Sequence, residues 1–197
     1  MKNNEGSGVA VSGEEDMDAN KFTQKSLQAV QSAQNTAIEY GNPELTALHL
    51  ALALLDKDGL CYRIIGRCGV DTDGLTNAVK DAVERLPRTS GGSQPYATPA
   101  VNRILTESEK LASGMKDDYI SVEHLFLCLF DNDERGLKEL FSRFGLNKNK
   151  FLEGMKQVRG NQNVTSDNPE ETYEALEKYG TDLTKRAREH KLEPVIG

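Results

Sequence analysis

One stretch of this chain occurs twice, and that doubling limits what the chain can fold into. Thr46-Ala-Leu-His-Leu-Ala-Leu-Ala-Leu-Leu-Asp56 is matched by Ser121-Val-Glu-His-Leu-Phe-Leu-Cys-Leu-Phe-Asp131, with His49 and His124 standing 75 positions apart. A hydroxyl side chain opens each copy in the position of a helix N-cap, and an aspartate closes each. A repeat of this length predicts two copies of one helical unit that bury their apolar faces against each other.

The first copy is predicted to contain four helices. Apolar residues at steps of three and four mark a helix over about 27–40, which Gly41-Asn42-Pro43 ends. Thr46 is expected to cap a central helix that runs to about Leu55. A short helix over 61–68 is expected to end at a left-handed Gly69, and a fourth, capped by Asp71 or Asp73, to reach residue 86.

The second copy repeats this pattern after a linker rich in Pro, Gly and Ser at 87–97. Thr98-Pro99 is a typical helix start, with a hydroxyl N-cap followed by proline at the first helical position. We therefore predict an all-α fold of two pseudo-symmetric four-helix repeats, at 20–86 and 98–158, in one domain spanning 20–158. Residues 1–19 are expected to be a disordered leader, native or left from expression, and 159–197 a linker with one further amphipathic helix.

Composition excludes several classes of protein. The net charge of −7 argues against sequence-independent binding of nucleic acid, which needs clustered Lys and Arg. The longest apolar run, residues 47–55, is about half of what a bilayer span needs, so no membrane association is expected. Cys61, Cys68 and Cys128 are odd in number and lie in apolar helical contexts, which favours reduced thiols and a cytoplasmic protein.

Few residues indicate catalysis. His49 and His124 are matched by the repeat, but a histidine there is more often a hydrogen-bonded packing residue, and no metal-ligand spacing accompanies either. No Gly-x4-Gly-Lys-Ser/Thr motif occurs, so this chain alone is not expected to be an enzyme or to hold a cofactor or metal. A small all-α enzyme using the paired histidines stays a third, weaker hypothesis.

Acidic residues gather at the start of the second central helix. Asp117, Asp118 and Glu123 can be read simply as solvated carboxylates near a positive helix end. They can also be read as a polar rim beside an apolar groove, which Tyr96 of the linker would help to cover.

The doubled unit, with its Leu-His-Leu and Glu-His-Leu helices, resembles the Clp N-terminal repeat domain. Asn20-Lys-Phe-Thr-Gln-Lys-Ser26 and Glu39-Tyr-Gly-Asn42 are most similar to the branch found in ClpB-type AAA+ disaggregases. The stretches Tyr173–Ala187 and Lys191–Gly197 resemble the segment that leads into the first ATPase module. The resemblance implies that Val195 and Ile196 border the adenine in the longer protein, which would use ATP and Mg.

The resemblance also implies a function. Such proteins are homohexamers that work with the DnaK chaperone system, and their N-domains bind exposed apolar segments of unfolded or aggregated polypeptides and deliver them to the pore. The chain itself is expected to be monomeric. The implied binding residues are Leu105 and Leu111 for an apolar floor, Asp117 and Glu123 for an acidic rim, and Tyr119 beside them.

A second binding function stays open. The same repeat domain in ClpC- and ClpA-type unfoldases docks adaptor proteins and feeds ClpP protease. Glu107 and His124 stand where relatives often carry leucine, so the polarity of the groove in this chain departs from the family pattern.

Overall fold

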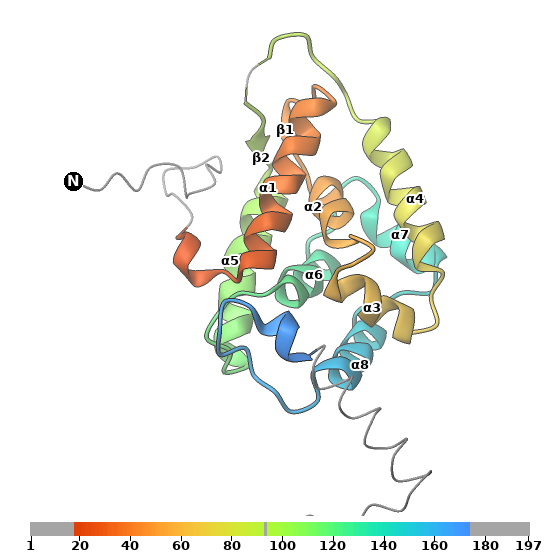
Figure 1. The fold of residues 1–197 in the computed structure, drawn as a ribbon. Helices are drawn as coiled ribbons and strands as arrows, with labels where there is room; N and C mark the ends of the chain where they lie inside the picture. Colours follow the sequence, from red (N-terminus) through yellow and green to blue (C-terminus); the bar gives the residue numbers. More distant parts are fainter. Residues whose placement is uncertain (1–17, 93, 174–197) are drawn as a thin grey trace, which may run out of the picture.

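The computed structural model describes residues 18–92 and 94–173. Val195, Ile196, most of the expected leader and nearly all of the helix expected after residue 170 lie outside these residues. The described part is helical apart from two short strands, which confirms the all-α prediction (Figure 1).

The first repeat folds into the four predicted helices. Thr23 caps the first by accepting a hydrogen bond from the Ser26 N–H at 3.2 Å, and Asp71 caps the fourth through the Gly74 N–H at 3.1 Å. Gly69 ends the third with a φ of +76°, as predicted from its position. The elements are the 3-10 helix η1 (Ala19–Lys21), α1 (Gln24–Glu39), α2 (Ala47–Leu54), α3 (Leu60–Arg67) and α4 (Thr72–Glu84).

The second repeat has the same four helices in the same order. Thr98 caps the first of them, with Pro99 at its first position, and Gly145 ends the third with a φ of +77°. The elements are α5 (Pro99–Gly114), α6 (Val122–Asp131), α7 (Leu137–Arg143) and α8 (Lys148–Arg159). Because α1 and α5, and the starts of α2 and α6, are each separated by 75 positions, the sequence repeat is a structural repeat.

The two repeats exchange short extended segments. Strand β1 (Glu44–Leu45) of the first repeat pairs in parallel with β2 (Tyr96–Ala97), which precedes the second. In return Ile120 pairs with Phe22, which precedes α1, through Thr23 N–H to Ile120 O at 2.9 Å and Ile120 N–H to Lys21 O at 2.8 Å. These pairings were not predicted, because two residues are too few to show the alternation of a strand.

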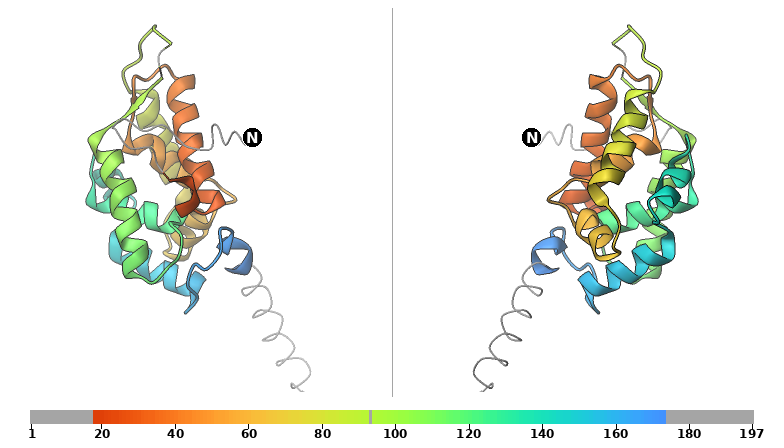
Figure 2. Two further views of the ribbon diagram at one scale, coloured as in Figure 1. Left: turned by 90° about the vertical axis from the view of Figure 1, so that its left-hand side faces the viewer. Right: turned by 90° about the vertical axis from the view of Figure 1, so that its right-hand side faces the viewer.

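A single core lies between the repeats. Helix α6 contacts α1, α2, α3, α5 and α8 and lies in the middle of the ribbon (Figures 1 and 2). Every residue from Val122 to Phe130 is buried. The rings of Phe126 and Phe151 stack with centroids 4.7 Å apart, and Phe130 and Phe141 pack around them. Helices α3 and α8 approach so closely that a Cβ on Gly154 would lie 2.8 Å from the Ile64 carbonyl oxygen, so this position needs glycine.

The chain that follows α8 packs back onto the domain. Val164 and Tyr173 are 0% and 1% exposed, and residues 169–173 begin a helix. The Gln24 N–H donates to the Asp167 carbonyl at 2.8 Å, which ties this segment to the start of α1. We call residues 160–173 the C-terminal strap. The packed body therefore continues beyond residue 158, where the sequence pattern placed the end of the domain.

Candidate functional site

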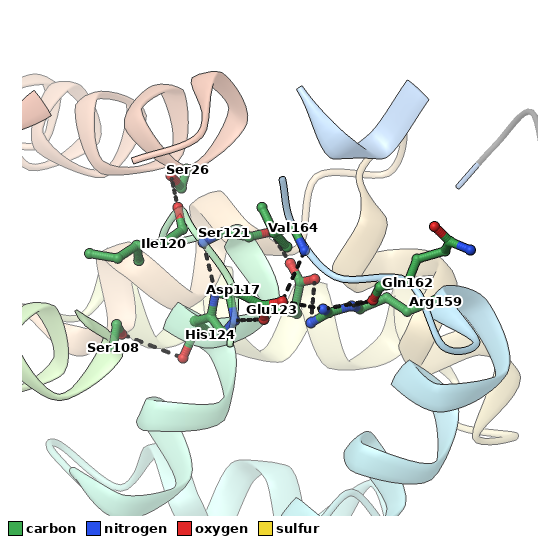
Figure 3. A network of polar contacts seen from close by, with 10 residues as sticks. All are labelled: Ser26, Ser108, Asp117, Ile120, Ser121, Glu123, His124, Arg159, Gln162 and Val164. Carbon is green, nitrogen blue, oxygen red and sulfur yellow. Dashed lines mark hydrogen bonds and ion pairs between the residues drawn. The ribbon is translucent and has the colours of Figure 1, made fainter. Parts of the chain in front are cut away.

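Buried charges cluster where the turn after α5 meets the end of α8 (Figure 3). The side chains of Asp117 and Glu123 are 0% exposed, and that of Arg159 is 4% exposed. Arg159 Nη2 lies 2.7 Å from Asp117 Oδ1, and its Nη1 lies 3.4 Å from Glu123 Oε2. One guanidinium thus sits between two carboxylates, an arrangement that offsets the large cost of burying each charge alone.

Asp117 is the centre of this cluster. Besides Arg159, its carboxylate accepts hydrogen bonds from His124 Nε2 at 2.7 Å and from the Val164 N–H at 2.9 Å. Burial alone would raise the pKa of Asp117, but the hydrogen bonds from His124, Arg159 and Val164 outweigh it and lower the pKa to about 2. The carboxylate is therefore ionised at neutral pH, and its charge holds the C-terminal strap to the second repeat.

Arg159 also binds the strap directly. Its Nε and Nη2 donate to the carbonyl oxygen of Gln162 at 3.3 and 2.9 Å. Burial acts to lower the pKa of Arg159, but the hydrogen bond to Asp117 and the charge of Glu123 hold it above its ordinary value. The arginine is thus both a counter-ion for the turn and the anchor of the segment that follows α8.

The paired histidines close the N-termini of the central helices. The Thr46 N–H donates to His49 Nδ1 at 2.9 Å, and the Ser121 N–H donates to His124 Nδ1 at 2.8 Å. Each Nδ1 therefore accepts, which places the single ring proton on Nε2. His49 Nε2 donates to Asn42 Oδ1 at 2.9 Å, and burial lowers the pKa of His49 to about 4. These contacts confirm the prediction that both histidines are hydrogen-bonded packing residues.

The structure corrects the expected surroundings of two predicted site residues. Asp117 and Glu123 were expected at the surface, either as solvated carboxylates or as a groove rim, and instead both are buried against Arg159. The sequence reasoning missed Arg159 because it stands 42 positions beyond Asp117, at the start of an apparent polar linker. The repeat did contain a usable signal. Asp117 matches Asn42 at the same spacing as the two histidines, so the second repeat has a carboxylate where the first has a neutral amide.

The three other predicted residues lie on or just after α5. Leu105 is 8% exposed and belongs to the core, whereas Leu111 and Tyr119 are half-buried and reach the surface. An ion pair between Lys21 Nζ and Glu109 Oε1, 2.7 Å apart, joins α5 to η1. Of the five predicted binding residues, Leu111 and Tyr119 are therefore the two that are partly exposed.

A cavity opens at a different junction. It has a volume of about 780 Å³ and lies between α1, the loop after α2, the start of α3 and residues 168–171 of the strap. None of the five predicted site residues lines it. Its lining combines aliphatic side chains with charged ones of both signs, which suits a segment of polypeptide rather than a wholly apolar ligand.

The described residues also include three cysteines. Burial raises the pKa of Cys61, Cys68 and Cys128, and all three are free thiols. Within residues 18–92 and 94–173, no three His, Cys, Asp or Glu side chains come together in a metal site. No helix in the same part of the chain is both long and apolar enough to span a bilayer.

Comparison with known families identifies the family to which the repeat belongs. The model of the Clp repeat (R) N-terminal domain matches residues 21–144. The chain belongs to this family. It is 41% identical over 186 residues to the chaperone protein ClpB of Bacillus cereus and 41% identical over 187 residues to that of Nitratidesulfovibrio vulgaris. Each alignment covers 92% of this chain, and the chain spans only about a fifth of either relative, 21% and 22%.

Solved structures share the fold. The N-terminal domain of Hsp104 from Candida albicans superposes with a TM-score of 0.69 at 18% identity, covering 76% of this chain and 99% of that one. A ClpV N-domain in complex with a VipB peptide superposes with a TM-score of 0.57 at 22% identity, covering 70% and 86%. These likenesses confirm the two-repeat Clp N-domain architecture.

Proposed function

We propose that this chain is the substrate-recognition domain of a ClpB-type disaggregase. It binds exposed apolar segments of unfolded or aggregated proteins and loads them to the pore of a hexamer. The observation that carries the proposal is the 41% identity with ClpB chaperones over nearly the whole chain. The ClpV N-domain bound to a peptide supports it, since a domain of this fold takes a segment of polypeptide as its ligand.

The surface formed by Leu111 and Tyr119 is the proposed client contact. Both side chains are half-buried, so each offers part of its apolar area to a client. Burial of apolar area stabilises a complex by about 25 cal/mol per Å², and ordering a flexible client offsets much of that gain. Binding is therefore weak, as a domain that hands its client onward requires. Asp117 and Glu123 support this contact indirectly, because they fix the turn that carries Tyr119. Leu105 supports it by packing α5 onto the core.

The wider roles follow from the same similarity. The longer protein would be a homohexameric AAA+ ATPase that uses ATP and Mg, cooperates with the DnaK system and works in the cytoplasm. Val195 and Ile196 would border the adenine there. The present chain would remain a monomer, because ring contacts in such machines come from ATPase modules.

An NMR titration of the isotope-labelled chain with reduced casein tests the proposal. We expect shifts at Leu111, Tyr119 and their neighbours, with a dissociation constant in the micromolar range or weaker. Tyr119→Ala should weaken binding about five-fold, the effect of about 1 kcal/mol. The matched control is Tyr96→Ala. Tyr96 was expected to help cover the groove, but it lies in β2 and is 54% exposed, before the N-terminus of α5 and about 18 Å of helix away from Leu111.

Two results would count against substrate loading. Absence of any shift with casein would remove direct client capture and favour the adaptor-docking role of ClpC- and ClpA-type domains. Equal losses for Tyr119→Ala and Tyr96→Ala would show that the contact surface lies elsewhere.

A further inference from the structure

The cavity beside α1 contains a carboxylate that the rest of the fold does not use. Glu170, on the C-terminal strap, lines the cavity and is 7% exposed. Among the described residues, no other residue donates a hydrogen bond to either of its carboxylate oxygens. Apart from its own backbone N–H, nothing among the described residues replaces the water that this carboxylate lost on folding, so its burial is costly.

Burial and the neighbouring charges both shift the pKa of the Glu170 carboxyl. Burial is the main cause that raises the pKa of Glu170 to about 7, and the carboxylate of Glu123 adds to it. Three groups lower the pKa of Glu170 without cancelling this rise: its own backbone N–H and the positive charges of Lys25 and Arg63. A cation placed in the cavity beside Glu170 would supply the favourable interaction that the fold leaves unmet.

The cavity wall has an excess of acid. Four carboxylate residues and two basic residues line it, namely Asp56, Asp58, Glu170 and Glu171 against Lys25 and Arg63. The apolar part of the wall includes Leu52, Leu60 and Val122. Long basic side chains need both kinds of surface, because their methylene stems lie on apolar groups while the charged end pairs with an acid.

We propose that this cavity is a second client contact, which takes an arginine or lysine side chain from the bound polypeptide and pairs its cation with Glu170. The proposal rests on the proposed client-binding function and specifies it: preferred segments carry a basic residue next to aliphatic ones. The stem lies against Leu52, Leu60 and Val122, and the acids at the rim repel negatively charged segments. The strap becomes part of the binding surface, since Glu170 and Glu171 belong to it.

Paired peptides test this directly. Two fluorescently labelled octapeptides are identical and aliphatic except for one central residue, arginine in one and citrulline, its uncharged near-isostere, in the other. By fluorescence anisotropy the 197-residue chain should bind the arginine peptide about five-fold more tightly. Glu170→Gln, which keeps the shape and removes the charge, should abolish the difference. Glu171→Gln is the matched control, because Glu171 lines the same cavity but is exposed, and it should preserve most of the preference.

A second variant keeps the test independent of the folding of Glu170→Gln. Lys25 is an exposed competitor for Glu170, so Lys25→Met should tighten binding of the arginine peptide and leave the citrulline peptide unchanged. Equal affinity for both peptides in the wild-type chain, or an unchanged preference in Glu170→Gln, would overturn the proposal. Casein shifts at Leu111 and Tyr119 that persist in Glu170→Gln would then show that client binding stands without this contact.

Discussion

The turns before the two central helices have the same geometry and different charges. In the first repeat the neutral amide of Asn42 accepts from His49 Nε2 at 2.9 Å and donates to the carbonyl oxygen of Pro87 at 2.9 Å. In the second, the carboxylate of Asp117 accepts from His124 Nε2 at 2.7 Å and from the Val164 N–H at 2.9 Å. Each residue thus ties its histidine cap to the segment that follows the fourth helix of its own repeat.

The difference shows how a repeated fold acquires a special site. An amide both donates and accepts, so Asn42 satisfies its surroundings without a counter-ion. A carboxylate only accepts, so Asp117 requires donors and a positive charge, and Arg159 provides both. From Gly69 and Gly145 onward the two repeats match at a spacing of 76 rather than 75, so the residue that corresponds to Arg159 is Val83, a buried core residue. The aspartate in the second turn is therefore accompanied by a buried arginine, Arg159, and by a C-terminal strap that packs on the domain.

The largest expected effect comes from giving the second turn the residue of the first. Among the described residues, Asp117→Asn leaves Glu123, 3.4 Å away, as the one carboxylate paired with the buried Arg159 guanidinium. We expect the free energy of unfolding to fall by about 3 to 5 kcal/mol at pH 7, measured by urea denaturation. The control is Asp118→Asn at the neighbouring exposed carboxylate, which should change it by less than about 0.5 kcal/mol.

The pH dependence of the free energy of unfolding shows whether the charge of Asp117 or its hydrogen-bond geometry causes the loss in Asp117→Asn. Because the pKa of Asp117 is lowered from 3.8 to about 2 in the folded protein, its charge stabilises the fold above pH 3.8, and this contribution is lost as the pH falls toward 2. The advantage of the wild type over Asp117→Asn should shrink in that window by about 2 kcal/mol. An advantage that stays constant down to pH 2 would mean that the hydrogen-bond geometry, not the charge, matters.

The reverse exchange should have a smaller effect. Asn42→Asp places a carboxylate oxygen against the Pro87 carbonyl, at a site that is 4% exposed and where Val83 stands in the position of Arg159. We expect a loss of about 2 to 3 kcal/mol in the free energy of unfolding at pH 7, recovered in part below pH 5 as the carboxyl takes up a proton. Asn35→Asp, on the exposed face of α1, is the matched control. A neutral result for Asn42→Asp would show that the first turn tolerates either residue.

The smallest expected effect concerns the backbone of the same turns. Gly41 has a φ of +67°, and Lys116, its match in the second repeat, has a φ of +61°. A side chain disfavours this left-handed conformation, so Lys116→Gly should raise the free energy of unfolding by about 0.5 to 1 kcal/mol. Thermal unfolding followed by circular dichroism would measure it. A lower melting temperature would instead indicate that the exposed Lys116 side chain makes a stabilising contact.

Much of the fold could be predicted because the repeat supplies each signal twice. The caps at Thr46, Asp71 and Thr98 and the left-handed glycines at 69 and 145 are local features, and local features are visible in a single sequence. The role of the histidines was also predictable, since each stands three residues after its N-cap hydroxyl. The exchanged segments were not, because each pairing joins residues more than 50 positions apart and is only one or two residues long.

The candidate site was harder to predict for a physical reason. Whether a carboxylate is solvated or buried depends on a distant counter-ion, and for Asp117 and Glu123 that counter-ion is Arg159 at the end of another helix. The composition of 159–169 is that of a solvated linker, and nothing local distinguishes it from one. Glu170 and Tyr173 likewise become buried because Arg159, Val164 and the hydrogen bond from Gln24 to Asp167 bring the strap back to the core.

The exchange of extended segments has a consequence for how this domain resists force. The Thr23 N–H reaches the Ile120 carbonyl, and the Thr98 N–H reaches the Leu45 carbonyl, so each repeat completes the backbone hydrogen bonding of the other. Neither repeat can separate from the other without breaking these backbone hydrogen bonds. The two repeats should therefore unfold in a single cooperative transition. A force that separates the two repeats would therefore have to break both pairings.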